Sequence, residues 1–314
     1  MTQRPRAPIH VLIALLAAIY ACGASRCSTP VRPQMPVSSS ALAATGATSN
    51  HAPSASAPTP VVGAPAPSDA APGLDAASAL PIPARRQHPD SPPSGWCGET
   101  VIQEALLYFG VWAPQRFIHA AGRSSHPDLY SDEVPVALQQ LGVVYDFYAP
   151  KGGGFEAYKT WTRHALEAGY PVLSGVKILP TEHPNWGLDH FVLTVGHGDS
   201  GLLVNTTWGN RQWVSDTATK GLSFRNVSYG IRLTGVRSRP NARAARLTVI
   251  SETATSVRLR VECPSMPAGA RGRVERRSLP SDKEPSWSSE GTGPVEVTIE
   301  ADRPARFQCV SGAS

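Results

Sequence analysis

The chain has 314 residues, enough for two ordinary domains, and contains 30 Pro and 27 Gly. Its formal net charge of +5 comes mainly from residues 1–88, where six Lys and Arg stand against two Asp and Glu. Residues 89–240 hold 12 basic against 13 acidic side chains, and residues 241–314 hold 11 against 9, so the balance argues against a nucleic-acid partner.

The N-terminus has the pattern of a secretory signal peptide, which we assign to residues 1–27. Arg4 and Arg6 precede a run from Ile9 to Ala21 that is apolar apart from two residues. A charged start followed by a short apolar run is typical of an export signal, and this run is too short to span a bilayer. We therefore expect the protein to be exported.

The apolar run ends in Ile19-Tyr20-Ala21-Cys22, which resembles a bacterial lipobox. The resemblance makes Cys22 a lipidation candidate, with simple secretion or a leader that stays in the membrane as alternatives. Lipidation would attach the N-terminus to a membrane, because each buried CH₂ group contributes about 0.8 kcal/mol. The expected location is secreted, periplasmic or membrane-anchored.

Residues 28–87 are predicted to form a disordered linker. They consist mostly of Ala, Pro, Ser, Thr and Val, as in Ser54–Pro60. This composition buries too little apolar area to offset the chain entropy, and its prolines favour extended conformations. The folded part is expected to begin near residue 88.

Cys97 stands at the start of a predicted helix that stops at Gly110. It is followed by apolar residues at helical spacing, namely Val101, Ile102, Ala105, Leu106 and Phe109. A thiol at a helix N-terminus has a lowered pKa, because the unpaired N–H groups and the helix dipole favour the thiolate. The alternative is a small buried residue before a helix, for which Cys is a common choice.

Further helices are predicted at 132–141 and 160–168, and strands at 143–147 and 171–176. His190 then begins a β-rich run, which is followed by a strand at 202–205.

A hairpin of these last two strands makes His190 and Asn205 expected cross-strand neighbours. Asn can accept a hydrogen bond from one ring N–H and leave the other ring nitrogen facing a thiol. Cys97, His190 and Asn205 are therefore the candidate catalytic residues.

Three motifs occur in an order that resembles the papain-fold cysteine peptidases, especially the C39-like branch of bacterial exported proteins. They are Trp96-Cys97-Gly98, the run Asp189–Gly196, and the run Val204–Gly209. The resemblance implies an α+β fold over residues 88–240, with a helical half packed against an antiparallel β half. It also implies Cys97 as nucleophile, His190 as general base and then acid, Asn205 as the residue that orients His190, and Trp208 as a shield of the His–Asn hydrogen bond.

The chain departs from this family at two places. The family usually has an oxyanion Gln about six residues before the Cys, where this chain has Ser91, so Gln87 becomes the oxyanion candidate beside the backbone N–H of Cys97. The branch often has Asp-Pro where this chain has Thr206-Thr207, which leaves Asn205 as the third member. Candidate residues of the substrate cleft are Trp96, Asp189 and Trp208.

The remaining Cys and His residues point to no metal and no cofactor. The central histidines lack partners at the spacing of metal ligands; they are His119, His126, His164, His183 and His197. Cys263 and Cys309 lie in predicted strands and are candidates for a disulfide in an oxidising compartment.

Residues 241–314 are predicted to form a small all-β domain. Short alternating runs lie at 246–250, 256–261 and 295–299 and are separated by turn residues. The pattern resembles a fibronectin type III-like β-sandwich, a module that more often binds or spaces than catalyses.

The sequence thus predicts an exported cysteine peptidase or amide hydrolase that works through an acyl-enzyme at Cys97. The expected substrate is a peptide, a protein or a cell-wall amide. Two alternatives stay open: a catalytically inactive module that binds peptides, and a transglutaminase-like acyl transferase.

Overall fold

The computed structural model describes residues 79–88, 95–123, 125–149, 153–227, 229–237, 242–266, 272–278, 287–291 and 293–311. These all belong to one compact unit, Asp69–Ser314. The predicted signal peptide, the lipidation candidate Cys22 and the linker up to residue 78 lie outside the described residues. In the described ranges, no helix has the length and apolar character needed to cross a bilayer.

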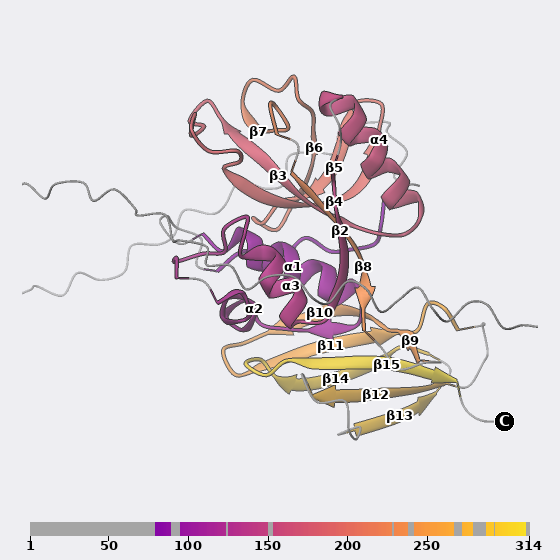
Figure 1. Ribbon diagram of the computed structural model, residues 1–314. Helices are drawn as coiled ribbons and strands as arrows, with labels where there is room; N and C mark the ends of the chain where they lie inside the picture. Colours follow the sequence, from indigo (N-terminus) through magenta and orange to yellow (C-terminus); the bar gives the residue numbers. More distant parts are fainter. Residues whose placement is uncertain are drawn as a thin grey trace, which may run out of the picture. The chain divides into compact units, whose positions relative to one another are not determined.

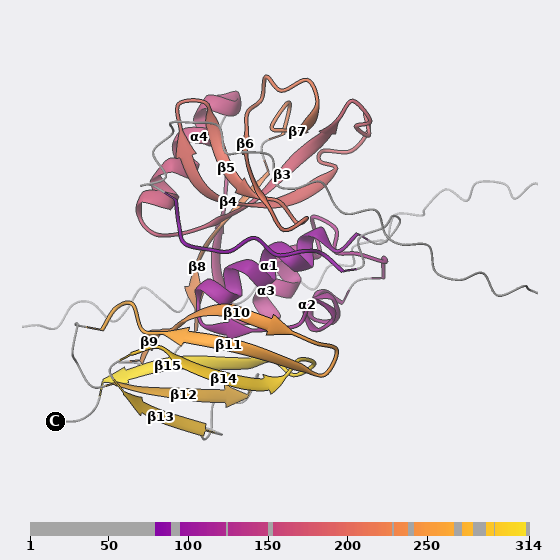
Figure 2. The same ribbon diagram turned by 180° about the vertical axis from the view of Figure 1, so that it is seen from behind.

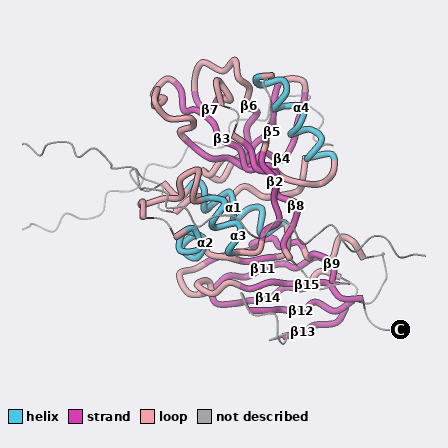
Figure 3. Tube along the Cα trace, viewed as in Figure 1, coloured by secondary structure: helices cyan, strands magenta, loops and turns pink. Residues whose placement is uncertain are grey.

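The described chain is built mainly from antiparallel strands, as Figure 3 shows. Four helices and fifteen strands occur in the described ranges, and each of their strand pairings is antiparallel. The predicted papain-like α+β layout, with a helical half against a β half, is therefore wrong. The prediction failed because few segments are helical. In addition, residues 211–236, for which no element was predicted, form three strands.

The central part is a seven-stranded sheet with helices packed on it. Its strand order is β2-β8-β3-β4-β5-β6, with β7 paired to β3. The strands are β2 (Val143–Phe147), β3 (Val172–Leu179), β4 (His190–Gly198), β5 (Gly201–Asn205), β6 (Arg211–Val214), β7 (Gly221–Ser223) and β8 (Gly230–Val236). The helices are α1 (Cys97–Tyr108), α2 (Gln115–Gly122), α3 (Val134–Gln140) and α4 (Gly154–Glu167).

Helix α1 packs on β4 of the central sheet (Figures 1 and 2). Val101 and Ile102 of α1 are fully buried and share an apolar cluster with Leu193 of β4. Because Cys97 is the first residue of α1 and His190 the first of β4, this packing sets both at the ends of two contacting elements.

The C-terminal strands form two sheets that share one apolar cluster. One sheet has the order β10-β11-β14, and the other has the order β1-β15-β12-β13 with β9 paired to β15. The strands are β1 (Val111–Trp112), β9 (Ala242–Ala244), β10 (Arg246–Glu252), β11 (Ser256–Glu262), β12 (Gly272–Ser278), β13 (Trp287–Gly291), β14 (Val295–Glu300) and β15 (Ala305–Ser311). Strand β1 directly follows α1, so this sheet contains a strand from the central part of the chain.

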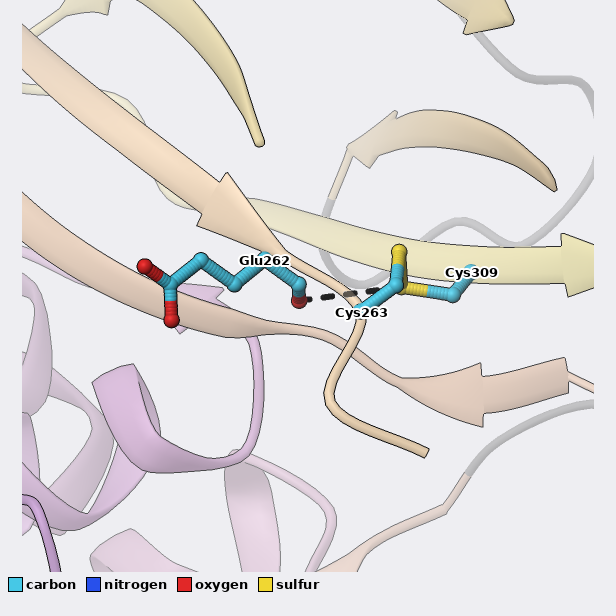
Figure 4. The surroundings of a disulfide bond; sticks show 3 residues. All are labelled: Glu262, Cys263 and Cys309. Atoms are coloured by element: carbon cyan, nitrogen blue, oxygen red, sulfur yellow. Dashed lines mark hydrogen bonds between the residues drawn. A yellow bond between two sulfur atoms is a disulfide. The ribbon is translucent and has the colours of Figure 1, made fainter. Parts of the chain in front are cut away.

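Cys263 and Cys309 form a disulfide that links the end of β11 to β15 (Figure 4). Sγ of Cys309 also lies 3.8 Å from the carbonyl oxygen of Glu262. The bridge therefore joins the two C-terminal sheets covalently.

Residues 79–88, which we call the N-terminal arm, pack against the central sheet although they were assigned to the linker. The backbone N–H of Leu80 donates to the carbonyl of Val195 at 2.7 Å, and Arg86 forms a β-bridge with Trp208. Ile82 is buried in the same apolar cluster as α1. Ordered packing thus begins before residue 88.

Candidate active site

Cys97 lies at the wall of a cavity of about 570 Å³. Leu129, Phe191 and Tyr229 supply apolar surface, and Asp128 adds a carboxyl group. The thiol itself is buried, and Phe191, the residue after His190, lines the same cavity. The nucleophile candidate therefore meets the start of β4 at the edge of a cavity.

Burial raises the pKa of the Cys97 thiol to about 12. The N–H groups of Phe191 and Gly98 oppose this shift, while the carboxyl groups of Glu99 and Asp128 add to it. The prediction that a helix start would lower this pKa is wrong, because desolvation of the thiolate outweighs the local N–H groups. The resting thiol is therefore protonated at neutral pH.

His190 is buried and neutral. Burial lowers the pKa of its imidazole to about 4, and the nearby Asp189 only partly opposes the shift. The ring stacks on the indole of Trp208 with 4.8 Å between the ring centroids. Trp208 thus covers one face of the imidazole. The expected shielding of a His–Asn hydrogen bond does not apply, because Thr207 takes the place of Asn205 beside His190.

Thr207 makes the hydrogen bond to His190 that was expected from Asn205. Its Oγ1 lies 2.9 Å from Nε2 of His190 and donates to Oε1 of Gln87 at 2.6 Å. A hydroxyl has one proton, so once it donates to Gln87 it can only accept from His190. This arrangement places the ring proton on Nε2 and leaves Nδ1 with a free lone pair.

Asn205 is directed elsewhere. The β4–β5 register sets Asn205 opposite Leu193, with a bulge between Thr194 and Gly196. Its Nδ2 donates to the carbonyl of Ile82 at 2.8 Å. The predicted meeting of Asn205 and His190 is thus not made, because the pairing is offset and the chain reaches the height of His190 only two residues later, at Thr207.

The amide of Asn205 instead belongs to a buried polar cluster that holds the N-terminal arm. Its Nδ2 lies 3.3 Å from Oε2 of Glu104, and its Oδ1 accepts from Nε of Arg211 at 2.8 Å. Oε1 of Glu104 accepts the backbone N–H of Arg85 at 2.6 Å. Burial raises the pKa of the Glu104 carboxyl to about 8.

Gln87 reaches the site from the N-terminal arm. It is buried, and its backbone N–H donates to the carbonyl of Thr207 at 2.7 Å. Its Nε2 would lie 3.0 Å from a methyl group added at Gly95, two residues before Cys97. The backbone N–H of Cys97, the other oxyanion candidate, donates to the carbonyl of Gly95 at 2.8 Å.

The two other cleft candidates have structural contacts of their own. Trp96 stacks on His119 with 5.2 Å between centroids, and its indole N–H donates to the carbonyl of Pro127. Asp189 lines the cavity, but its carboxylate accepts the backbone N–H of Ile178 at 3.0 Å and lies 3.5 Å from Nζ of Lys177. Asp189 therefore anchors the loop before β4.

The site's two central groups are not joined directly. Among the hydrogen bonds of the described residues, none links the Cys97 thiol to the imidazole of His190, whose Nε2 contacts Thr207 instead. In the same ranges, no group of three His, Cys, Asp or Glu could hold a metal ion.

Thr207 is the functional candidate that the sequence did not single out. Thr207 lies two residues after Asn205, in the turn that follows the end of β5. Which residue of this turn meets His190 was not visible in the sequence. A search among models of known protein families finds no match for this chain, and a search among curated proteins finds none either.

Proposed function

We propose that the protein is an exported hydrolase of peptide or other amide bonds, with Cys97 as nucleophile and His190 as general base. The observation that carries this proposal is the hydrogen bond between Thr207 and Nε2 of His190. With the proton on Nε2, it leaves Nδ1 of a neutral imidazole as the proton acceptor at the start of β4, and Cys97 lines a cavity at the start of α1.

In this reaction, Nδ1 of His190 takes the thiol proton as the sulfur of Cys97 attacks the substrate carbonyl. The resulting oxyanion accepts a hydrogen bond from Nε2 of Gln87. The imidazolium returns its proton to the leaving amine as the C–N bond breaks and a thioester forms. A water molecule, deprotonated by His190, then hydrolyses the thioester and restores the thiol.

The order of the sequence motifs supports the chemistry, though not a papain-like layout. The Trp96-Cys97-Gly98 start and the run from Asp189 resemble cysteine peptidases in their residues. Export is supported by the leader pattern and by the disulfide between Cys263 and Cys309, since disulfides persist in oxidising compartments. The proposed substrates are a peptide, a protein or a cell-wall amide.

A second candidate function is a module that binds peptides without cleaving them. The observation that favours it is the neutral state of both groups, with the thiol pKa raised to about 12 and the imidazole pKa lowered to about 4. Burial is the main cause of both pKa shifts. In an active enzyme, substrate and polar groups would therefore have to enter the site before the proton passes from Cys97 to His190.

A peptide-library cleavage assay separates the two candidates. We expect the full chain to cleave peptides and the Cys97→Ala and His190→Ala variants to lose turnover while remaining folded. Peptide binding without cleavage by the unchanged chain would instead establish the binding module. Addition of an amine acceptor distinguishes hydrolysis from acyl transfer, because a transferase would release the aminated product.

A further inference from the structure

A second cavity of about 370 Å³ lies where the ends of α1 and β8 meet the C-terminal strands. It shares no lining residue with the cavity beside Cys97. Its walls are partly apolar, with Phe109, Val236 and Phe307 among them. Polar groups reach it from β10 and β15, which makes it a candidate binding site of its own.

Gln308 is the unexplained polar group of this cavity. The residue is 2% exposed, and among the described residues neither its Oε1 nor its Nε2 has a hydrogen-bond partner. Phe307 and Cys309 on either side belong to the apolar cluster of the C-terminal sheets, so alternation along β15 turns Gln308 to the opposite face. A buried amide without partners is costly, and such groups in native proteins normally have a partner.

The cavity is electropositive. Arg246 and Arg306 both line it, and none of its described lining residues is Asp or Glu. The guanidinium of Arg246 lies 5.1 Å from the ring centroid of Tyr108, and its buried Nε has no hydrogen-bond partner in the described part of the chain. Glu275, opposite Gln308 on β12, is ion-paired with Arg273 at 2.6 Å, so its charge is already compensated.

We propose that this cavity binds the α-carboxylate end of an amino acid or peptide whose last side chain is apolar. Arg246 supplies the charged donor that planar carboxylates prefer, and Arg306, whose Nη1 already donates to the carbonyl of Arg237, adds positive charge to the cavity. Nε2 of Gln308 donates to the same carboxylate, and its Oε1 accepts the neighbouring N–H of the ligand. Phe109 and Val236 pack on the apolar side chain. The proposal does not depend on any reaction at Cys97.

Calorimetric titration of the full chain carrying Cys97→Ala tests the ligand chemistry. We expect N-acetyl-leucine to bind and N-acetyl-leucinamide, which lacks the charge, to bind about 10-fold more weakly or worse. Free leucine tests the source: tighter binding of leucine assigns a free amino acid, and tighter binding of N-acetyl-leucine assigns a peptide end. Binding of inorganic phosphate alone, or of none of these probes, would overturn the proposal.

Two variants test the residues, with a matched control. Arg246→Gln and Gln308→Leu should each weaken N-acetyl-leucine about 10-fold or more, whereas Arg260→Gln removes an exposed arginine of β11 and should leave affinity unchanged. Gln308→Leu should unfold at the same or a higher temperature, because it replaces an unpartnered buried amide by an apolar group of similar shape. A Gln308→Leu protein that is destabilised but binds normally would show that the amide has only a structural role and refute the site.

Discussion

Oγ1 of Thr207 lies 2.9 Å from Nε2 of His190, and this contact fixes which ring nitrogen carries the proton. The hydroxyl donates onward to Gln87, so the three side chains form a chain that runs from the imidazole to the N-terminal arm. Orientation of the proposed base therefore depends on a segment that precedes the nucleophile in sequence by ten residues.

Thr207→Val should lower kcat by about 100-fold with little change in KM, because the imidazole loses the acceptor that holds its tautomer while the side chain keeps its shape. Thr207→Ser keeps the hydroxyl and should retain most activity. The matched control is Thr206→Val, since the Thr206 hydroxyl bonds to Asn210 rather than to His190. Steady-state kinetics of the three variants measure the effect, and equal losses in all of them would contradict the role of Thr207.

Gln87 is expected to act through both polar atoms of its side-chain amide: Oε1 accepts from Thr207, and Nε2 donates to the oxyanion. Gln87→Leu removes both ends and should cost about 100-fold or more in kcat. Gln87→Glu keeps the acceptor for Thr207 but removes the Nε2 donor, and its buried carboxylate should raise the pKa of His190 and move the acid limb of the kcat profile to higher pH.

Gln115→Leu is the control for loosening of the N-terminal arm. It removes the hydrogen bonds of Gln115 to the carbonyl of Arg86 and the N–H of His88 without touching Thr207. A pH–rate profile of each variant is the measurement. A loss in Gln115→Leu as large as that in Gln87→Leu would show that arm docking, rather than the Gln87 amide, is what matters.

The free energy of unfolding should depend on pH through the ionisation of Glu104. Its pKa is raised from 4.5 in the unfolded chain to about 8 by burial, so the folded protein binds the proton more tightly. This contribution to stability is fully present below pH 4.5 and is lost as the pH rises towards 8, with a magnitude of about 5 kcal/mol.

Urea unfolding between pH 4.5 and 9 measures this contribution. Glu104→Gln cannot ionise, so the difference in unfolding free energy between the unchanged chain and the variant should change steadily up to about pH 8 and then level off. A difference that stays constant with pH would mean that Glu104 keeps its ordinary pKa.

Local patterns in the sequence predicted the elements that carry the site, but not how they pair. Apolar spacing placed a helix from Cys97, and the structure starts α1 there. The strand at His190 and the hairpin to β5 were also visible, because they are local. The register was not, since no local pattern in the sequence marks the bulge between Thr194 and Gly196.

Two kinds of strand could not be predicted: those that pair with distant parts of the chain, and those without alternating apolar residues. Strand β8 pairs with β2 and β3, which lie far from it in the chain. Strands β12 and β13 lack a run of alternating apolar residues. Likewise, the sequence predicts the helix start at Cys97. It does not predict the raised pKa of the Cys97 thiol, because that shift comes from burial in the folded protein.

Asn205 should matter for stability rather than for catalysis. Asn205→Leu would leave the carbonyl of Ile82, the carboxyl of Glu104 and the guanidinium of Arg211 short of a partner in a buried place, at a cost of about 3 kcal/mol in unfolding free energy. The contact between Thr207 and His190 does not involve this amide. The kcat of the folded fraction should therefore stay within about threefold of that of the unchanged chain. Removal of the partner that orients a general base would instead lower kcat ~100-fold. Thermal unfolding and kcat, measured on the same sample, separate the two effects. If Asn205→Leu folded normally and lost as much kcat as Thr207→Val, the amide rather than the hydroxyl would be the group that orients His190.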